Sequence, residues 1–401
     1  MNQKVKVLIN TSTYKENHED KVTDVINNLI YSILKSDKNF EFLVLKPMST
    51  EKHKEILFNG IKVKKYRYFW PNKSQTFHEN GILPSLQKNK INILKLLILI
   101  ISQFINLFLT SLKFKPDYIY AHWFLPQAII SALVCKILKI KLVFTTHGAE
   151  VLLLNNIKLL NKILINFVLK NTYKFTANSE ITLNEIKKNC KPDYISSKYM
   201  VIPMGIQDKF FKENNIEFNN DNNFLYIGRL VDYKGVDMLI KCLNKFKDSG
   251  NNFRLDILGS GVDENLLKKE VHNLGLENYI VFHGFKNFDE KLKFYKNASL
   301  TFIPSIVSDK RLEGGPLTLI EAMSQKNICI VSDSVGFVKY CNNKNSLVFA
   351  SGDIESMYNK LIKYTEMNKD EKESMRNFAF EDSKFFKFEN IGKIHSDFLF
   401  Q

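Results

Sequence analysis

The chain has 401 residues, with 57 Lys and Arg against 42 Asp and Glu, and a formal net charge of +15 at pH 7. This length exceeds what one hydrophobic core commonly supports, so we expect two domains with a cleft between them. Five scattered cysteines include no C-x-x-C pair and no zinc spacing. This arrangement excludes a disulfide framework and indicates buried, reduced thiols in a cytosolic chain.

The positive charge is concentrated in the first half of the chain. Residues 1–205 contain 30 Lys and Arg against 14 Asp and Glu, and residues 206–401 contain 27 against 28, so the halves carry +16 and −1. A basic half can bind nucleic acid, an anionic membrane or a phosphorylated substrate. Stacking-rich nucleic-acid motifs are absent, which favours membrane or phosphate. A solvated lysine-rich surface is the alternative explanation.

The sequence begins with a short alternating apolar run, MNQKVKVLIN, that predicts a first strand. This run lacks the hydrophobic region and the small-residue cleavage site of a signal peptide. We therefore expect a cytoplasmic protein.

Short β-branched runs alternate with helix-length segments along the rest of the chain. The runs are VKVLIN, FEFLVL, DYIYAH, KLVFTT, KFTANS and MVIPM, followed by FLYIG, FRLDILG, YIVFHG, LTFIPS and NICIVS. This alternation predicts parallel sheets with helical crossovers. The fold class is therefore α/β, with two Rossmann-like, doubly wound parallel-sheet domains that face each other across a cleft.

A polar, Asn-rich stretch interrupts the strand series and marks the domain boundary. We predict an N-terminal domain over 1–203 that binds the acceptor and a linker over 204–223. A nucleotide-binding domain follows over 224–375, and a C-terminal helix within 376–401 packs back on the first domain. Ligands of such sheets bind beyond the carboxyl ends of the strands. Candidate residues that follow predicted strands are His147, Arg229, His283, Ser305 and Glu313.

Residues 91–112, INILKLLILIISQFINLFLTSL, are long and apolar enough to suggest a membrane span. Their polar residues trace one narrow stripe on a helix, which predicts an amphipathic helix with a wide apolar face. The stripe contains Asn92, Lys95, Ser102, Gln103, Asn106 and Thr110. A crossover helix buried against the sheet, an interfacial membrane helix and a true span remain open. The lysine- and aromatic-rich residues 52–73 are either a basic neighbour for the interfacial helix or an ordinary strand and loop.

Two carboxylates and two cations in the second half form the most informative constellation. Glu313 and Glu321 have E-x7-E spacing within EGGPLTLIEAM, and Arg229 and Lys234 lie within YIGRLVDYKG. Glu321 lies inside a predicted helix and Glu313 precedes it, so both can point into one cleft. The two cations suit a nucleotide diphosphate, whose departure from a sugar places negative charge on the β-phosphate.

Several motifs in order along the chain resemble the retaining glycosyltransferases of the GT-B fold, in the family 4 or group 1 type that includes bacterial polysaccharide and lipopolysaccharide transferases. The motifs are AHWFLPQ, TTHGAEV, VIPMGI, YIGRLVDYKG, LDILGSG, VFHGF, PSIVSDKRLEGGPLTLIEAM and SLVFASGD. The resemblance covers nearly the whole chain. It implies a retaining transferase of the hexosyltransferase type, in which the departing diphosphate helps to take the acceptor proton.

The resemblance also implies roles for individual residues. Glu321 accepts hydrogen bonds from the ribose, Glu313 contacts the donor sugar, and His147 lies beside that sugar. The loop at Phe285 meets the base, and His122 and Gln127 are weaker acceptor-side candidates. The alternatives are a surface ion pair for the cations, a structurally paired glutamate for Glu321, and structural roles for His147, His122 and Gln127.

Backbone amides of the Gly-Gly-Pro turn provide further donors for the diphosphate. Gly315, Leu317 and Thr318 lie at the start of the predicted helix, where amides lack intrahelical partners. The sequence contains no D-x-D triplet, which argues against a metal held on the diphosphate by acidic residues. We therefore expect no metal and no other cofactor.

Two segments differ from the pattern of the family. The loop after the first strand, TSTYKENHEDK, lacks the glycine pair that many relatives have. The segment VGFVKYC at 335–341 has Lys339 and Tyr340 where relatives often have a glycine pair and a glutamate. These differences put the loop contacts in doubt and indicate an altered donor or acceptor preference.

Together these observations predict transfer of a sugar, from a UDP-sugar, to a lipid-linked or growing surface glycan. The expected partners are the nucleotide-sugar donor, the lipid-linked or oligosaccharide acceptor and an anionic membrane surface, with no nucleic acid. The basic domain would hold the protein peripherally on the inner face of the cytoplasmic membrane. A sugar-nucleotide epimerase of the same fold and a non-catalytic glycan-assembly protein are the alternatives. A glycan phosphorylase is disfavoured by the short chain.

Overall fold

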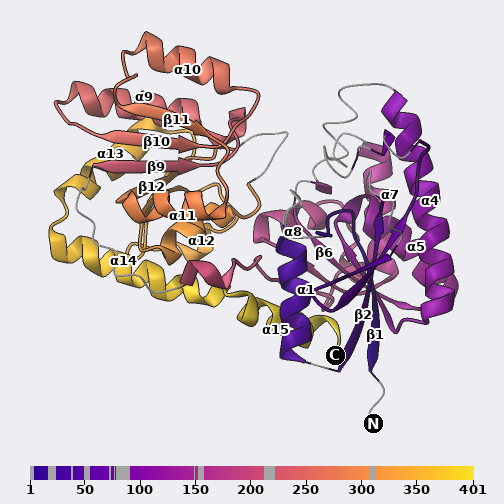
Figure 1. Ribbon diagram of the computed structural model, residues 1–401. Coiled ribbons are helices and arrows are strands. Elements are labelled where there is room, and N and C mark those ends of the chain that lie inside the picture. Colours follow the sequence, from indigo (N-terminus) through magenta and orange to yellow (C-terminus); the bar gives the residue numbers. More distant parts are fainter. Residues whose placement is uncertain are drawn as a thin grey trace. The chain divides into compact units, whose positions relative to one another are not determined.

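A computed structural model of the protein describes residues 4–16, 24–37, 39–48, 55–71, 74–75, 77, 91–148, 150–151, 158–211, 222–307 and 313–401. The chain forms two compact units (Figure 1). Unit 1 contains residues 1–202 and 388–401, and unit 2 contains residues 203–387. Part of the predicted linker, residues 212–221, lies outside the described residues.

Unit 1 is built on an eight-stranded sheet in the order β3-β4-β2-β1-β5-β6-β7-β8. Its strands are β1 (Val5–Asn10), β2 (Phe40–Pro47), β3 (Glu55–Phe58), β4 (Ile61–Tyr66), β5 (Tyr118–His122), β6 (Lys141–Thr146), β7 (Thr172–Ala177) and β8 (Tyr199–Val201). The short edge strand β3 runs antiparallel to β4, and the pairs β1–β2 and β1–β5 are parallel. The strand order reverses beside β1, so the loops after β1 and β5 meet at the switch point of the sheet.

Helices cover the sheet of unit 1. They are α1 (Val25–Ser36), α4 (Ile91–Phe114), α5 (Ile129–Leu138), α7 (Lys158–Lys170), α8 (Glu180–Lys187) and α15 (Phe388–Leu399), with short turns η2 (Phe124–Ala128) and η3 (Pro192–Tyr194). The last helix, α15, returns to unit 1 and buries His395 beside Tyr120 of β5. The contacts therefore assign 388–401 to unit 1, where the sequence prediction gave 376–401.

Unit 2 has a six-stranded, wholly parallel sheet in the order β11-β10-β9-β12-β13-β14. Its strands are β9 (Asn223–Ile227), β10 (Arg254–Leu258), β11 (Ile280–Gly284), β12 (Leu300–Ile303), β13 (Ile328–Ser332) and β14 (Leu347–Phe349). Strand order reverses between β9 and β12, so the loops after these two strands form the edge where such sheets bind ligands. Both units confirm the prediction of parallel α/β sheets.

The helices of unit 2 are α9 (Val236–Asp248), α10 (Glu264–Asn273), α11 (Phe288–Asn297), α12 (Leu317–Ser324), α13 (Ile354–Glu366) and α14 (Lys369–Ser383), with turns η4 (Asp208–Phe211), η5 (Asp232–Lys234), η6 (Val338–Tyr340) and η7 (Lys384–Phe386). Capping side chains define several helix starts. Asn287 and Glu290 form a capping box at α11, and Asn368 and Glu371 form one at α14. Such caps satisfy the first amides of a helix.

Candidate active site

The loop after β9 carries both predicted cations and is fixed by close backbone packing. Gly259, in the loop after β10, has φ +132°, and a Cβ atom there would lie 1.8 Å from the carbonyl oxygen of Gly228. A residue with a side chain cannot replace it without moving one of the two loops. The Tyr226 hydroxyl donates to the carbonyl of Arg229 at 3.0 Å. Burial raises the pKa of Tyr226, and the negative charge of Glu313 raises it further, so this phenol remains a neutral donor.

Arg229, Lys234 and Glu313 form one cluster at the carboxyl end of β9. Lys234 is ion-paired with Glu313, and their side chains are only 15% and 11% exposed. The Arg229 guanidinium donates to the Tyr233 hydroxyl, and its carbon lies 5.8 Å from the centre of the Tyr233 ring. Two cations and one carboxylate leave an excess of positive charge, which favours an anionic ligand at this edge.

The start of α12 lies in the same part of unit 2 as Glu313. Pro316 is the N-cap residue, and no side chain caps the amides of the first turn, which includes Leu317 and Thr318. A Cβ atom at Gly315 would lie 2.4 Å from the Phe337 ring, so only glycine allows the turn to approach this buried aromatic. Uncapped amides at a helix N-terminus suit a phosphate group.

The segment that differs from the family pattern supports this turn. The amide of Gly336 donates to the carbonyl of Glu313 at 2.8 Å, and Phe337 packs against Gly315. Lys339 and Tyr340 lie one turn further, in η6, where Tyr340 stacks edge-on against Phe386. The segment 335–341 therefore positions Glu313 through its backbone.

Glu321 is buried and already has charged and polar partners. Lys291 of α11 donates to both carboxylate oxygens at 2.8 Å, and the Tyr295 hydroxyl donates to one of them at 2.9 Å. Lys291 is therefore the kind of partner that the alternative interpretation requires, in which Glu321 is a structural glutamate paired with a cation. A carboxylate has about four acceptor positions, so three bonds leave room for a ribose hydroxyl. The sequence analysis did not identify Lys291, although a buried glutamate needs such a partner.

Phe285 follows β11 and is 83% exposed. The preceding Gly284 has φ +66°, and its carbonyl accepts from the Gly259 amide at 2.8 Å. The aromatic ring therefore stands on a loop that is tied to the loop after β10. His283 lies within β11 and not after it, and its Nε2 is 2.7 Å from Asp256, so it is a structural partner of that carboxylate. Ser305 is buried after β12, and its carbonyl accepts from the Ser334 hydroxyl.

In unit 1, His147 follows β6 and is positioned by Glu150. The Glu150 carboxylate accepts from the His147 amide at 2.9 Å, the Thr146 hydroxyl at 2.8 Å and the Phe124 amide at 3.2 Å. The His147 ring lies 4.4 Å from Trp123, centre to centre, and Nε2 has no hydrogen-bond partner among the described residues. Burial lowers the pKa of His147, which favours a neutral ring. Sequence analysis missed Glu150, although a buried acid beside a candidate histidine signals such a role.

His122 and Gln127 are both buried. His122 lies between Tyr120 and His147, at 4.3 Å and 5.7 Å between ring centres, and burial holds its pKa well below the usual value. Gln127 belongs to η2, where its carbonyl accepts from the Asn10 amide group at 3.4 Å. Both side chains are almost fully buried, and their contact with an acceptor stays a prediction.

The loop after β1 is held by two buried lysines that the sequence analysis did not identify. Glu16 is ion-paired with Lys46 at 3.0 Å and with Lys65 at 2.5 Å. Lys46 also donates to the carbonyl of Tyr14 at 2.6 Å. The ion pairs lower the pKa of Glu16 against the opposing effect of burial. This loop has a defined conformation over residues 11–16 without the glycine pair of the family.

Within the described residues, no group of three or more His, Cys, Asp or Glu side chains is arranged to hold a metal ion. The five cysteines are unpaired, and Cys135, Cys242 and Cys329 are buried. Burial raises the pKa of each of these three thiols, so they are poor nucleophiles.

Two family models match adjoining parts of the chain. Glycosyl transferases group 1 matches residues 207–382, and Glycosyltransferase Family 4 matches residues 65–210. Together the two models span residues 65–382, so both halves of the chain match glycosyltransferase families. This confirms the resemblance found in the sequence motifs and agrees with the two parallel-sheet units.

Curated relatives match over part of their length. An uncharacterized glycosyltransferase of Methanocaldococcus jannaschii is 29% identical over 52% of this chain and 53% of its own. The lipopolysaccharide 1,6-galactosyltransferase of Escherichia coli is 26% identical over 35% of this chain and 39% of its own. The chain thus spans about half or less of these relatives.

A solved structure extends the likeness over the whole fold. Anabaena HepE, crystallised in complex with UDP and glucose, has a TM-score of 0.69 and 16% identity over 98% of each chain. At this identity the likeness shows the fold, which is GT-B.

Proposed function

We propose that this glycosyltransferase is a retaining, metal-independent enzyme that transfers a sugar from a UDP-sugar to a lipid-linked or growing surface glycan. The observation that carries the proposal is the cluster of Arg229, Lys234 and Glu313 beside the uncapped start of α12. UDP in the HepE complex and the lipopolysaccharide acceptor of the E. coli relative support the choice of donor and acceptor.

The cluster suits departure of a nucleoside diphosphate. The bond between the sugar C1 and the diphosphate oxygen breaks, and its electron pair goes to the leaving oxygen. Arg229, Lys234 and the amides at Leu317 and Thr318 stabilise the developing charge, as preorganised donors do in low-dielectric sites. These groups take the part that a divalent ion has in metal-dependent transferases, so chelators should leave the rate unchanged.

Retention follows if the acceptor hydroxyl attacks C1 on the face that the diphosphate leaves. Its oxygen forms the new bond, and its proton passes to a departing phosphate oxygen, so no protein base is needed. Glu313 accepts from hydroxyls of the donor sugar once the diphosphate shares Lys234. His147, as a neutral ring with an available Nε2, can accept a hydrogen bond from a sugar hydroxyl.

The base and ribose have separate candidate contacts in unit 2. The exposed loop at Phe285 is a surface on which a base can lie, with the backbone of Gly284 beside it. Glu321 retains one acceptor position for a ribose hydroxyl and is oriented by Lys291 and Tyr295. Lys291 thereby becomes a positioning residue for the donor.

The test is hydrolysis of a panel of UDP-, GDP- and ADP-sugars in EDTA, followed by mass spectrometry to detect cleavage and by NMR to distinguish anomers and isomers. We expect cleavage of a UDP-sugar with release of the sugar in the α-configuration, and loss of this cleavage in Lys234→Ala. Lys363→Ala, an exposed lysine on α13, is the matched control. Conversion of the sugar nucleotide into an isomer would instead identify an epimerase. Absence of both cleavage and binding of every donor would favour a non-catalytic assembly protein.

A further inference from the structure

Helix α4 exposes an unbroken apolar stripe. Every residue from 93 to 112 with an exposed side chain is Ile or Leu, and each of these is 47–59% exposed. They are Ile93, Leu94, Leu97, Ile101, Ile105, Leu109 and Leu112. The spacing of three or four residues places them along one face of the helix.

The opposite face of α4 packs on the sheet and carries the polar residues of the helix together with Leu99 and Leu107. Asn92, Gln103 and Thr110 are buried. The Gln103 amide donates to Asn10 of β1 at 2.8 Å, and Lys64 of β4 donates to the Thr110 hydroxyl at 2.9 Å. Surface helices of water-soluble domains have the reverse arrangement. The polar stripe seen in the sequence therefore faces the protein, and the apolar stripe faces outward.

The apolar surface continues onto the two neighbouring helices. Leu133 and Ile137 of α5 and Ile163 of α7 are exposed. Between the three helices lies a groove of about 470 Å³ lined only by apolar side chains. Ile101, Leu133 and Ile163 belong both to this groove and to the exposed surface, so the stripe and the groove form one apolar face.

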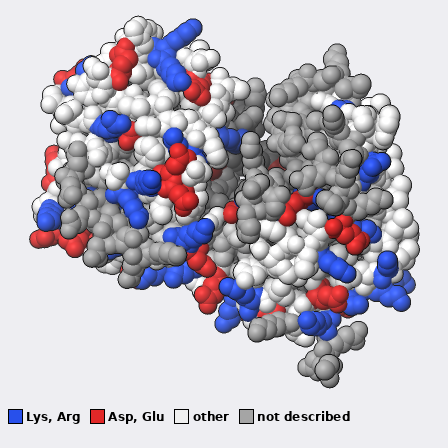
Figure 2. All heavy atoms as spheres, viewed as in Figure 1, with Lys and Arg blue, Asp and Glu red and all other residues white. Residues whose placement is uncertain are grey.

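The three helices that form this apolar face carry charges of one sign only. Helices α4, α5 and α7 contain no Asp or Glu, and they contain six lysines: Lys95, Lys113, Lys136, Lys158, Lys162 and Lys170. Figure 2 shows uncharged residues over much of the outer edge of unit 1, where Figure 1 labels α4 and α5. Cationic and acidic side chains are interspersed over unit 2 in the same view.

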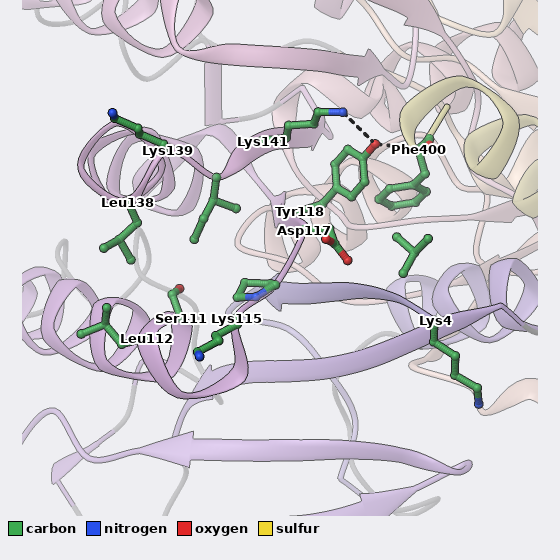
Figure 3. A pocket seen from close by; sticks show the side chains of 13 residues that line it. Lys4, Ser111, Leu112, Lys115, Asp117, Tyr118, Leu138, Lys139, Lys141 and Phe400 are labelled. Carbon is green, nitrogen blue, oxygen red and sulfur yellow. Dashed lines mark hydrogen bonds between the residues drawn. The ribbon is translucent and has the colours of Figure 1, made fainter. Parts of the chain in front are cut away.

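A basic pocket of about 800 Å³ adjoins the end of this face (Figure 3). Leu112 and Leu138 contribute to its wall, and Lys4, Lys115, Lys139 and Lys141 surround it. Asp117 is the one acidic residue in its lining, and its carboxylate accepts from the Lys6 amide at 2.8 Å. The pocket thus offers positive charge at the level of the last turn of α4.

We propose that unit 1 docks on an anionic lipid bilayer through this face. The Ile and Leu side chains of α4, α5 and α7 enter the boundary between head groups and acyl chains, and the surrounding lysines contact lipid phosphates. Apolar burial combined with a polybasic surface is the pair of contributions that stable peripheral binding needs. The helix lies in the membrane plane, because its buried polar side chains are bonded to the sheet.

A second copy of the chain is a poorer occupant of the face. An isologous dimer would bring the lysines of two copies together, and these three helices contain no acidic residue to pair with them. Anionic phosphates complement the same lysines. The charge pattern therefore selects the bilayer.

The orientation of α4 in the membrane plane fits transfer to a lipid-linked acceptor. This part of the inference rests on the proposed function. Lys115 and Asp117 connect α4 to the amino end of β5. A helix of 24 residues is about 36 Å long, so α4 runs from there toward the carboxyl edge of the sheet, where His147 lies. Docking along α4 keeps this edge near the membrane, where a lipid-linked acceptor would be.

Flotation of the whole protein with vesicles tests the docking in the absence of donor and acceptor. Vesicles of phosphatidylcholine with phosphatidylglycerol are compared with phosphatidylcholine alone. We expect binding to the anionic vesicles and about tenfold weaker binding for Ile101→Gln/Leu109→Gln and for Lys115→Glu/Lys139→Glu. The matched controls in unit 2, Val262→Gln/Leu266→Gln and Lys363→Glu/Lys369→Glu, should bind like the wild type.

Three results would overturn the docking. One is no vesicle binding, or equal binding by all variants. Another is resistance to alkaline carbonate extraction, which would indicate a span. The third is a dimer that fails to float and that Ile101→Gln/Leu109→Gln dissociates, which would assign the face to a second copy. Donor cleavage by the α4 variants, measured without vesicles, should be intact, so failure of docking is distinguishable from failure of the donor site.

Discussion

The crossover helices α4 of unit 1 and α9 of unit 2 present opposite surfaces. On α9 the buried side is apolar, with Leu239 and Leu243 fully buried, and the outer side carries Lys241, which is paired with Asp237 and Glu270 at 3.6 Å. On α4 the buried side carries Gln103 and Thr110 beside Leu99 and Leu107, and the exposed residues from 93 to 112 are all Ile or Leu. The same type of crossover therefore serves two environments, water on unit 2 and, by our proposal, lipid on unit 1.

We assign donor binding to unit 2, and Lys234→Ala is the variant for which we expect the largest loss of donor cleavage. Loss of one preorganised cation at the leaving group should lower kcat/KM for donor cleavage by about 10²–10³-fold. Vesicle binding should be unchanged, because Lys234 belongs to unit 2. Steady-state cleavage and flotation measure the two effects.

The matched control for Lys234→Ala is Lys241→Ala, on the outer side of α9 in the same unit. It should cleave the donor at the wild-type rate. Equal rates for both variants would remove Lys234 from the donor site.

In unit 1, Glu150 fixes the loops at the ends of β5 and β6 through its hydrogen bonds. Glu150→Gln removes a charged acceptor from three donors and should destabilise this region by about 2 kcal/mol. Hydrogen exchange of the β5 and β6 amides measures the change. Glu41→Gln, on the exposed side of β2, is the control. Unchanged exchange in Glu150→Gln would mean that the neutral amide holds the loops equally well.

Acid should destabilise unit 1 more than unit 2, because unit 1 contains buried neutral histidines. Burial lowers the pKa of His395 to about 3, below its unfolded value of about 6.5. The unfolded chain therefore binds the proton first. The contribution of His395 to the free energy of unfolding is complete above about pH 6.5. It falls by about 1.4 kcal/mol per pH unit as the pH drops toward 3.

Hydrogen exchange at pH 7 and pH 5 measures the acid effect in each unit. His395→Gln should reduce the acid dependence of unit 1, where His122 and His147 still contribute, whereas His272→Gln, at an exposed site of unit 2, should leave the dependence of unit 2 unchanged. Equal acid sensitivity of both units would contradict the role of burial.

Apolar runs predicted most strands of both sheets, because parallel strands are buried on two faces. The exceptions were informative. The edge strand β3 (EILF) and the short β14 (LVF) escaped notice because neither forms a long apolar run, and β4 (IKVKKY) remained one of two alternatives because lysines alternate along it. β3 and β14 are edge strands, where short or polar sequences are tolerated.

Motif spacing predicted which residues gather in unit 2, but not how they are paired. The Lys234–Glu313 pair joins residues that the motifs had already singled out. The partner of Glu321, Lys291, comes from another element, α11, whereas Glu150 follows His147 by three residues in the same loop. The pairing of Glu321 depends on which elements pack together, and no local pattern encodes it. The need for a partner of a buried charge was predictable, whereas its identity was not.

The smallest expected effect sharpens the comparison of α4 with α9. Ile105→Gln, on the apolar stripe, should change the free energy of unfolding by less than about 0.5 kcal/mol, because its side chain already faces outward. Leu243→Ala, in the buried side of α9, should cost about 3 kcal/mol through the cavity that it leaves.

Denaturant unfolding without vesicles provides both values. Adding anionic vesicles should then stabilise the wild type more than Ile105→Gln, since only the folded face binds them. A large loss of stability in Ile105→Gln without lipid would mean that the stripe packs against protein in solution. The two helices would then differ only in composition, and the assignment of α4 to a lipid surface would fail.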